Sequence, residues 1–288
     1  MSNQPAEPSM IELGTFNTLT VVSQRDNQYG LDAGELGEIT LVDKDAPDNL
    51  KVGDTLTAFV YVDGKNQTIA TLQTPLAQVD QVAWLKCVSL SHAGAFLAWG
   101  LPKDLLLPFS EQKGKIVEGR SYLVRLFLDE NNRIAATMML DDFIQDQAFY
   151  YKEGQEVQII IADETDLGFK AVVDNKYWGV LYKNETFQLL QKGQALTAYV
   201  KKVRPDNKLD LILSQEKYGQ KVDATSEKIL AVLVKRGGYV ALTDKSAPEI
   251  IYDTFGVSKK VFKQAIGGLY KQRRIVIEEA GIRLVEQA

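Results

Sequence analysis

Three segments of the chain repeat one order of features, and this repeat constrains the fold more than any other property. Each copy has an alternating strand, a glycine that opens a second strand, a variable loop, a second glycine, a long apolar-alternating strand, a polar turn and a final strand. The spacing of the two glycines is nearly constant, in the pairs Gly30 and Gly53, Gly94 and Gly119, and Gly168 and Gly193. A threefold internal repeat predicts three copies of one structural unit.

About five short strands in roughly 65 residues, bounded by glycine and polar turns, are typical of a small closed antiparallel barrel. Closure removes the unpaired edges that an open sheet of this size leaves exposed. The glycine at the start of the second strand is expected to allow the sharp bend that closure needs. We therefore predict a mainly β, multidomain chain that begins with three tandem five-stranded barrels.

The residues of these copies resemble the S-one RNA-binding domain, an OB-fold barrel named after a ribosomal protein. Gly94-Ala95-Phe96-Leu97 matches the family's second strand, and Gly179-Val180-Leu181-Tyr182 matches its third strand with tyrosine in place of histidine. Leu211-Ile212-Leu213-Ser214 matches its last strand. The resemblance implies an OB fold for each barrel.

The period of the apolar residues changes from two to 3.6 beyond Asp223, which predicts a different domain. Ile229, Val232 and Leu233 form the stripe of a first helix that stops at Gly237-Gly238. Ser246-Ala247-Pro248-Glu249 predicts a capping box and a second helix with apolar Ile250 and Phe255. Ser258 caps a third helix, and strands at 275–277 and 282–285 form a hairpin. Helices followed by a hairpin wing indicate an α+β winged-helix domain.

The third helix carries the polar surface expected of a recognition helix. Its predicted apolar face holds Phe262, Ala265, Ile266 and Leu269. Between Ser258 and Arg274 there are six basic residues and no acid. We expect a phosphate-binding surface there, made by Lys259, Lys260, Lys263, Gln264, Lys271, Arg273 and Arg274.

Three such barrels followed by a winged helix resemble the bacterial conserved virulence factor B family, from about Met10 to Glu286. The stretch from Trp99 to Phe109 adds an element of that family. The resemblance implies an RNA-binding protein that regulates gene expression after transcription. The expected boundaries are a disordered tail at 1–9, barrels at 10–76, 80–143 and 152–216, and the winged helix at 222–286.

The net charge of −5 is divided unequally among these units. The first repeat carries four basic and ten acidic residues, the second seven and five, the third nine of each, and the winged helix eleven and eight. Phosphate contacts need cations, so the acidic first barrel is expected to be a spacer or a surface for a protein partner.

The third barrel and the winged helix are the expected binding surface. Lys201, Lys202, Arg204 and Lys208 cluster on one strand and turn, and Lys217 and Lys221 lie just beyond. Lys170 occupies the surface position that holds Phe96 in the second copy, where an aromatic side chain can stack on an unpaired base. Tyr182 occupies the family's histidine position, as Thr40 and Pro108 do in the other copies.

Catalytic, metal and cofactor sites are not expected. Cys87 and His92 are the only cysteine and histidine, which excludes a multi-cysteine zinc site and an internal disulfide. No phosphate-binding glycine loop or nucleophile elbow occurs. No run of eighteen apolar residues and no signal peptide is present, so we expect a cytoplasmic, non-membrane protein that is not an enzyme.

Three classes of function stay open at this point. The leading interpretation is binding of single-stranded RNA by a monomer. The second is a transcription factor that places the winged helix in a DNA groove, although no dimerisation helix is visible. The third is a protein-interaction scaffold that uses the acidic first barrel.

Overall fold

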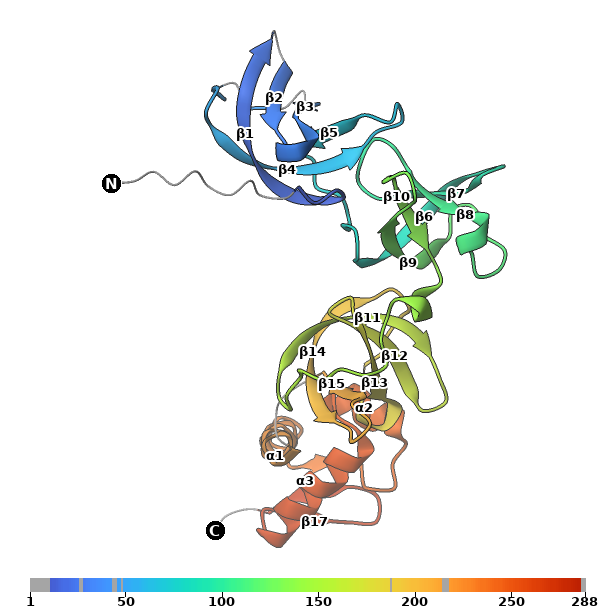
Figure 1. The fold of residues 1–288 in the computed structure, drawn as a ribbon. Coiled ribbons are helices and arrows are strands. Elements are labelled where there is room, and N and C mark those ends of the chain that lie inside the picture. The colour runs from blue at the N-terminus through green and yellow to red at the C-terminus, as the bar shows by residue number, and fades with distance from the viewer. Residues whose placement is uncertain are drawn as a thin grey trace.

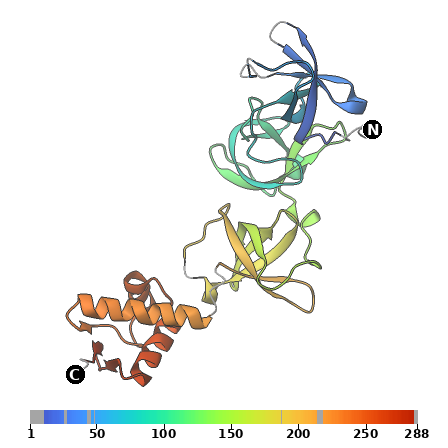
Figure 2. The same cartoon turned by 90° about the vertical axis from the view of Figure 1, so that its left-hand side faces the viewer.

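The computed structural model describes residues 11–25, 28–42, 46–47, 49–186, 188–213 and 218–285, without the side chains of 218–224. Four units follow one another in chain order and form an elongated row (Figures 1 and 2). Three are closed five-stranded barrels and the fourth combines helices with a three-stranded sheet. The predicted fold class is therefore confirmed. The predicted tail at 1–9 lies outside the described residues.

The three barrels share one strand order, in which the third and fifth strands form the parallel pair that completes the closure. Barrel 1 consists of β1 (Thr15–Arg25), β2 (Gln28–Asp32), β3 (Glu38–Leu41), β4 (Thr55–Val62) and β5 (Thr68–Thr71). Barrel 2 consists of β6 (Val82–Ser91), β7 (Gly94–Ala98), β8 (Leu105–Pro108), β9 (Ser121–Leu128) and β10 (Ile134–Thr137). Barrel 3 consists of β11 (Glu156–Glu164), β12 (Gly168–Val173), β13 (Tyr177–Tyr182), β14 (Ala195–Val203) and β15 (Leu209–Ile212). Short 3-10 turns lie at Gly34–Leu36, Phe109–Glu111, Leu140–Asp142 and Lys183–Glu185.

In barrels 2 and 3, the glycine that opens the second strand lies against the backbone of the third strand. A Cβ atom on Gly94 would lie 2.2 Å from the carbonyl oxygen of Leu107, and one on Gly168 would lie 2.0 Å from that of Leu181. These glycines therefore permit a close approach of two strands. Every barrel also has a register shift on its first strand, at residues 21–23, 87–89 and 161–163, and barrel 3 has another on β14 between Val200 and Lys202. A bulge bends a strand, so the first strand of each barrel bends at its register shift.

Apolar contacts join the three barrels. Phe59 of β4 packs edge-on against Trp99 of barrel 2, with ring centroids 6.0 Å apart. Between barrels 2 and 3, a buried cluster includes Val82, Leu140 and Trp178. The Val82 N–H also donates to the Asn175 side-chain oxygen at 2.9 Å. These contacts fix barrel 3 and the segment before it against barrel 2.

The winged-helix domain has its own core. Its elements are α1 (Tyr218–Lys235), β16 (Tyr239–Val240), α2 (Pro248–Phe255), α3 (Lys259–Lys271), β17 (Ile275–Ile277) and β18 (Ile282–Leu284). The strand β16 adds to the predicted hairpin through β18. The predicted apolar face of the third helix is confirmed, because its four residues are all buried.

Two details predicted for the second helix are wrong. Ile250 is 53% exposed, and Ile251 is the buried residue, because Ile251 and Phe255 lie one turn apart on the face toward the core. The residue before the helix is Ala247, which makes no side-chain cap. The Ser246 hydroxyl instead accepts from the Thr243 N–H at 2.9 Å, so it stabilises the preceding turn.

Candidate nucleic-acid interface

A hollow of about 490 Å³ opens on one side of barrel 3. It lies over the second and third strands and between the β11–β12 loop and the β14–β15 turn, the regions that OB folds use to bind oligonucleotides. We call it the barrel-3 face, and its lining comprises Asp146, Thr165, Asp166, Leu167, Lys170, Trp178, Gly179, Val180, Arg204, Lys208 and Leu209.

The turn between the fourth and fifth strands has the same backbone in all three barrels. Its fourth residue is an asparagine with positive φ in every copy (Asn66, Asn132 and Asn207). Its first residue is Asp63 in barrel 1 and Asp129 in barrel 2, and each carboxylate accepts two N–H groups of its own turn. In barrel 3 that residue is Arg204. The third copy has therefore replaced a turn-stabilising acid with a cation.

Two further equivalent positions follow the same trend. The second-strand position holds Asp32, Phe96 and Lys170 in barrels 1, 2 and 3, as the register of these strands shows. The last position of the turn holds Gln67, Arg133 and Lys208. Over the three positions, barrel 1 carries two acids, barrel 2 one acid and one base, and barrel 3 three bases. At these three positions the net charge is therefore negative in barrel 1, zero in barrel 2 and positive in barrel 3, and phosphate groups need cations.

Each cation of the barrel-3 face has an internal partner. The Lys170 ammonium lies 3.0 Å from an Asp141 oxygen and 3.6 Å from the centroid of the Trp178 ring. The Lys208 ammonium lies 3.3 Å from Asp146. The hydrogen bond from Lys170 lowers the pKa of Asp141 below its usual value. Barrel 3 thus contributes the cations of this face, and Asp141 and Asp146, which precede the barrel, neutralise part of their charge.

Tyr182, at the family's histidine position, is held by polar partners. Its hydroxyl accepts from Arg204 and donates to Asp210 at 3.3 Å. The Arg204 guanidinium also donates to Asp210 at 2.8 Å, and this hydrogen bond raises the pKa of Arg204. Tyr182 is half-buried. Because its hydroxyl accepts a hydrogen bond from Arg204, it orients the guanidinium at the rim of the face.

The two remaining predicted residues of barrel 3 lie outside this hollow. Lys201 is paired with Glu185 in the turn that follows β13. Lys202 is exposed and forms no ion pair with any described residue. Lys217 and the side chain of Lys221 lie outside the described residues, so a continuous basic surface from barrel 3 to the winged helix stays a prediction.

Phe96 lies on the second strand of barrel 2 and is half-buried. It lines a smaller hollow of about 250 Å³ on the equivalent side of that barrel. Tyr61 and Val62 from β4 of barrel 1 line the same hollow. The neighbouring barrel therefore narrows this face. Trp99 is buried and its indole N–H donates to the Lys103 carbonyl at 2.6 Å, as expected of a structural residue.

The third helix presents its predicted polar residues to solvent. The Ser258 hydroxyl accepts from the Val261 N–H and caps the helix, as predicted. Lys263 lies 3.4 Å from Asp244 but is 65% exposed. The other predicted residues are exposed, except for the half-buried Lys259: Lys260, Gln264, Lys271, Arg273 and Arg274.

Arg273 has an unusual backbone. Its φ is +57°, a region that glycine normally occupies at the end of a helix. The Arg274 N–H donates to the Leu269 carbonyl at 2.9 Å and the Arg273 N–H to the Tyr270 carbonyl at 3.0 Å, which is the Schellman pattern. A side chain costs free energy in this backbone conformation, and such costs are typical of functional sites. The arginine at this position is therefore a candidate binding residue.

Sequence reasoning missed Trp178 and the two acids Asp141 and Asp146. Side chains alternate between the two sides of a strand, and Gly179 and Leu181 face the inside of the barrel. Trp178 therefore lies on the outer side of β13, and this position could have been predicted from the sequence. The acids gave no comparable signal, because they precede barrel 3 in the chain and meet its lysines only through folding.

Comparisons with known proteins agree with the architecture. Residues 13–73 match the S1 domain model, and residues 227–284 match the CvfB-like winged helix domain model. Conserved virulence factor B of Staphylococcus saprophyticus is 26% identical, over 96% of this chain and 95% of that protein. The Staphylococcus aureus protein of the same name is also 26% identical, over 96% and 95% of the two chains. A solved multidomain protein with nucleic acid binding domains from Streptococcus pneumoniae is 25% identical, covers 95% of this chain and 98% of its own, and has a TM-score of 0.41.

These findings confirm the predicted resemblance to conserved virulence factor B proteins and indicate a nucleic-acid-binding chain. Neither matched model describes a catalytic family. In the described part of the chain, no group of three histidine, cysteine or acidic residues is placed to hold a metal ion. No helix among the described residues is long and apolar enough to cross a membrane.

Proposed function

Starting from this resemblance to conserved virulence factor B proteins, we propose that the chain is an RNA-binding regulator that acts on gene expression after transcription. It binds single-stranded RNA mainly through the barrel-3 face and helix α3. The observation that supports this most strongly is the exchange along the repeat, from Asp63 and Asp129 to Arg204 at the same turn position. A change from acid to base on one copy alone favours a site for anions there.

The barrel-3 face suits an unpaired strand. Leu167, which is 71% exposed, and the half-buried Val180 supply apolar surface for bases, while Lys170, Arg204 and Lys208 supply charge for phosphates. OB surfaces combine these two elements when they bind single strands, since bases in a duplex are not available for stacking. Phe96 adds a second aromatic contact on barrel 2, and the acidic barrel 1 serves as a spacer or as a surface for a protein partner.

Helix α3 and the turn after it supply further phosphate contacts. Lys260, Lys271, Arg273 and Arg274 are exposed there. The backbone of Arg273 has a conformation that disfavours side chains, and the presence of an arginine there supports a role in binding. The winged helix therefore extends the cationic surface beyond the barrel.

The proposal is tested by the affinity of a labelled single-stranded RNA for the full chain, measured by fluorescence anisotropy between about 0.1 and 1 M salt. The variant Lys170→Gln/Lys208→Gln removes two cations from the barrel-3 face. Each single-strand phosphate contact contributes about 0.7 to the slope of log K against log salt. We expect the slope to fall by about 1.4, which corresponds to roughly 25-fold weaker binding at 0.1 M salt.

The matched control is Lys152→Gln/Lys176→Gln. Both lysines are exposed on barrel 3, outside the hollow, and neither forms an ion pair with a described residue. We expect this control to stay within about threefold of the wild type, because it makes the same change in net charge away from the face. Equal affinities of the wild type and Lys170→Gln/Lys208→Gln would contradict the proposal.

The same assay with single-stranded and duplex DNA separates the alternative functions. We expect RNA to bind more tightly than either DNA. A preference for duplex DNA would favour a transcription factor that uses the winged helix. Absence of binding to all three nucleic acids would favour a protein scaffold.

A further inference from the structure

The segment that joins barrels 2 and 3 is fixed beside the barrel-3 face. The Gln145 N–H donates to the Lys176 carbonyl at 2.8 Å, and the Gln145 carbonyl accepts from the Trp178 N–H at 2.9 Å. Further along, the Ala148 N–H donates to the Asn207 carbonyl at 2.9 Å. Ile144, which precedes Gln145, is buried. The segment from 141 to 149 is therefore held along the barrel by its backbone, which sets the position of its side chains.

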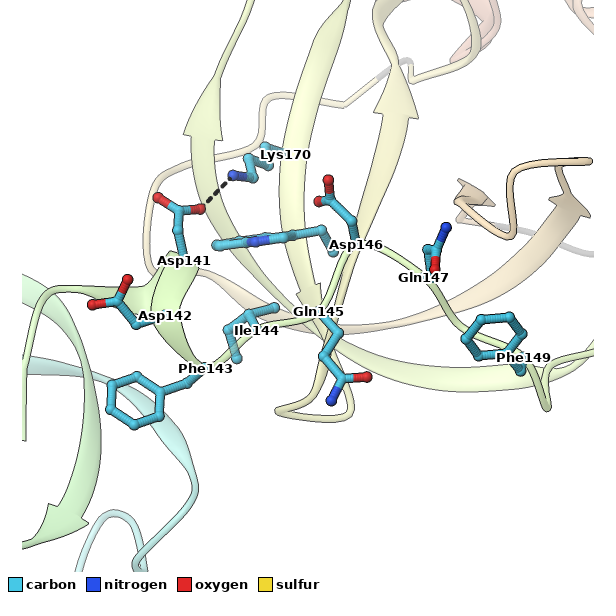
Figure 3. A pocket seen from close by; sticks show the side chains of 10 residues that line it. Asp141, Asp142, Phe143, Ile144, Gln145, Asp146, Gln147, Phe149 and Lys170 are labelled. Atoms are coloured by element: carbon cyan, nitrogen blue, oxygen red, sulfur yellow. Dashed lines mark hydrogen bonds and ion pairs between the residues drawn. The ribbon is translucent and has the colours of Figure 1, made fainter.

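Two carboxylates of this joining segment meet the lysines of the face. Asp141 lies 3.0 Å from Lys170 and also 3.1 Å from Lys113 of barrel 2. Asp146 lies 3.3 Å from Lys208. Figure 3 shows Asp141 joined to Lys170, with Asp146 projecting toward the same region from further along the segment.

A second hollow of about 630 Å³ continues the first along the joining segment. The two hollows share Asp146, Lys170 and Trp178. The acids therefore lie within the path that a bound strand would follow over the barrel-3 face. Carboxylate oxygens accept hydrogen bonds from lysine as phosphate oxygens do, so both compete for the same donors.

We propose that Asp141 and Asp146 are internal competitors of the nucleic acid, which occupy Lys170 and Lys208 in the free protein and release them when phosphate groups bind. This inference rests on the proposed function for the location of the binding face. It assigns to the joining segment a role in setting the affinity of barrel 3, beyond its role as a covalent connection.

The strength of these ion pairs suits reversible competition. The exposed fractions of the side chains are 59% for Asp141 and 62% for Asp146. Those of their partners are 36% for Lys170 and 44% for Lys208. Exposed pairs are weak, so a phosphate group that brings further contacts can displace a carboxylate. Wild-type binding is then weakened by the need to break two such pairs.

The test compares the full-length wild type with Asp141→Asn/Asp146→Asn in the anisotropy assay with single-stranded RNA. Asparagine keeps the shape of each side chain and removes the charge that holds the lysine. Breaking two exposed pairs corresponds to roughly a 2- to 30-fold change in the binding constant. We expect the variant to bind more tightly than the wild type by a factor in this range.

The matched control is Glu130→Gln/Glu153→Gln. Both acids are exposed and lie outside the two hollows, and neither carboxylate forms an ion pair within the described part of the chain. The control changes the net charge by the same amount without releasing a lysine, so we expect less than about a twofold gain. An equal gain in both double variants would overturn the inference, as would unchanged or weaker binding of Asp141→Asn/Asp146→Asn with an unchanged circular dichroism spectrum.

Inorganic polyphosphate, which has no bases, distinguishes this inference from the proposed function. We expect Asp141→Asn/Asp146→Asn to gain affinity for polyphosphate as well, because its lysines are released for any phosphate chain. If that gain occurs while neither protein prefers RNA to polyphosphate, the proposed function fails and the competition stands. If RNA is preferred but neither ligand gains, the competition fails and the proposed function stands.

Discussion

Replacement of Arg273 by glycine should stabilise the winged helix and weaken nucleic-acid binding at once. Arg273 has a φ of +57° at the end of α3. A left-handed conformation costs a non-glycine residue about 1–2 kcal/mol. Glycine loses more backbone entropy on folding, roughly 0.5–1 kcal/mol. The net expectation for Arg273→Gly is a gain of about 0.5–1 kcal/mol in the free energy of unfolding of this domain.

Hydrogen exchange of the buried α3 amides measures this change in the full chain, because such amides exchange only when the domain opens. A gain of that size slows their exchange by about two- to fivefold. The matched control is Arg274→Gly, which removes the same charge from a neighbouring exposed position without a positive φ. In Arg274→Gly, the buried α3 amides should exchange about two- to fivefold faster than in the wild type, because only the entropy cost of glycine applies.

Both arginine variants should bind single-stranded RNA more weakly, with the salt slope reduced by about 0.7 for each lost phosphate contact. Faster exchange in Arg273→Gly would refute the strain argument. Unchanged RNA affinity in Arg273→Gly would refute the functional explanation of Arg273.

Two further predictions concern stability. Alanine at Gly53, Gly119 or Gly193, which all have positive φ, should cost about 0.5–1 kcal/mol in denaturant titrations, because the cost of a side chain in this conformation exceeds the backbone entropy that alanine saves. Gly193→Ala should cost about 1–3 kcal/mol more, since its Cβ would lie 2.2 Å from the Trp84 ring across the barrel interface. Equal costs at the three positions would show that this contact is loose. The lowered pKa of Asp141 means that its hydrogen bond from Lys170 stabilises the folded state fully above the unfolded pKa of about 3.9 and is lost as pH falls through the lower folded value. Urea titrations should therefore show Asp141→Asn less stable than the wild type at pH 7 and equally stable near pH 2; a difference that persists at about pH 2 would contradict this origin.

The repeat made the barrels predictable from sequence, because glycines and alternating residues recur at nearly constant spacing and each strand must present one face to a core. The third helix was predictable for the same kind of reason, since its cap and apolar stripe agree. The second helix shows the limit of this reasoning. A shift of one residue at its start exchanges Ile250 and Ile251 between solvent and core, and a short helix gives little pattern to fix that phase.

The candidate site was only partly predictable. Lys170 was identified because the repeat aligns it with Asp32 and Phe96, and Arg204 and Lys208 because they cluster with two lysines on one strand and turn. Their partners Asp141 and Asp146 were not, because ion pairs between a connecting segment and a barrel depend on how the segment docks. A charge count for each barrel omits such a segment, and so it overstated how free the cations of barrel 3 are.

Photo-crosslinking of a 4-thiouridine RNA to the full chain, with the modified peptides identified by mass spectrometry, would locate the RNA on the protein. We expect crosslinks in β12, β13, the 204–208 turn and helix α3, and far fewer at the equivalent strands and turn of barrel 1. Crosslinks spread equally over the three barrels, or concentrated on barrel 1, would contradict binding at the barrel-3 face.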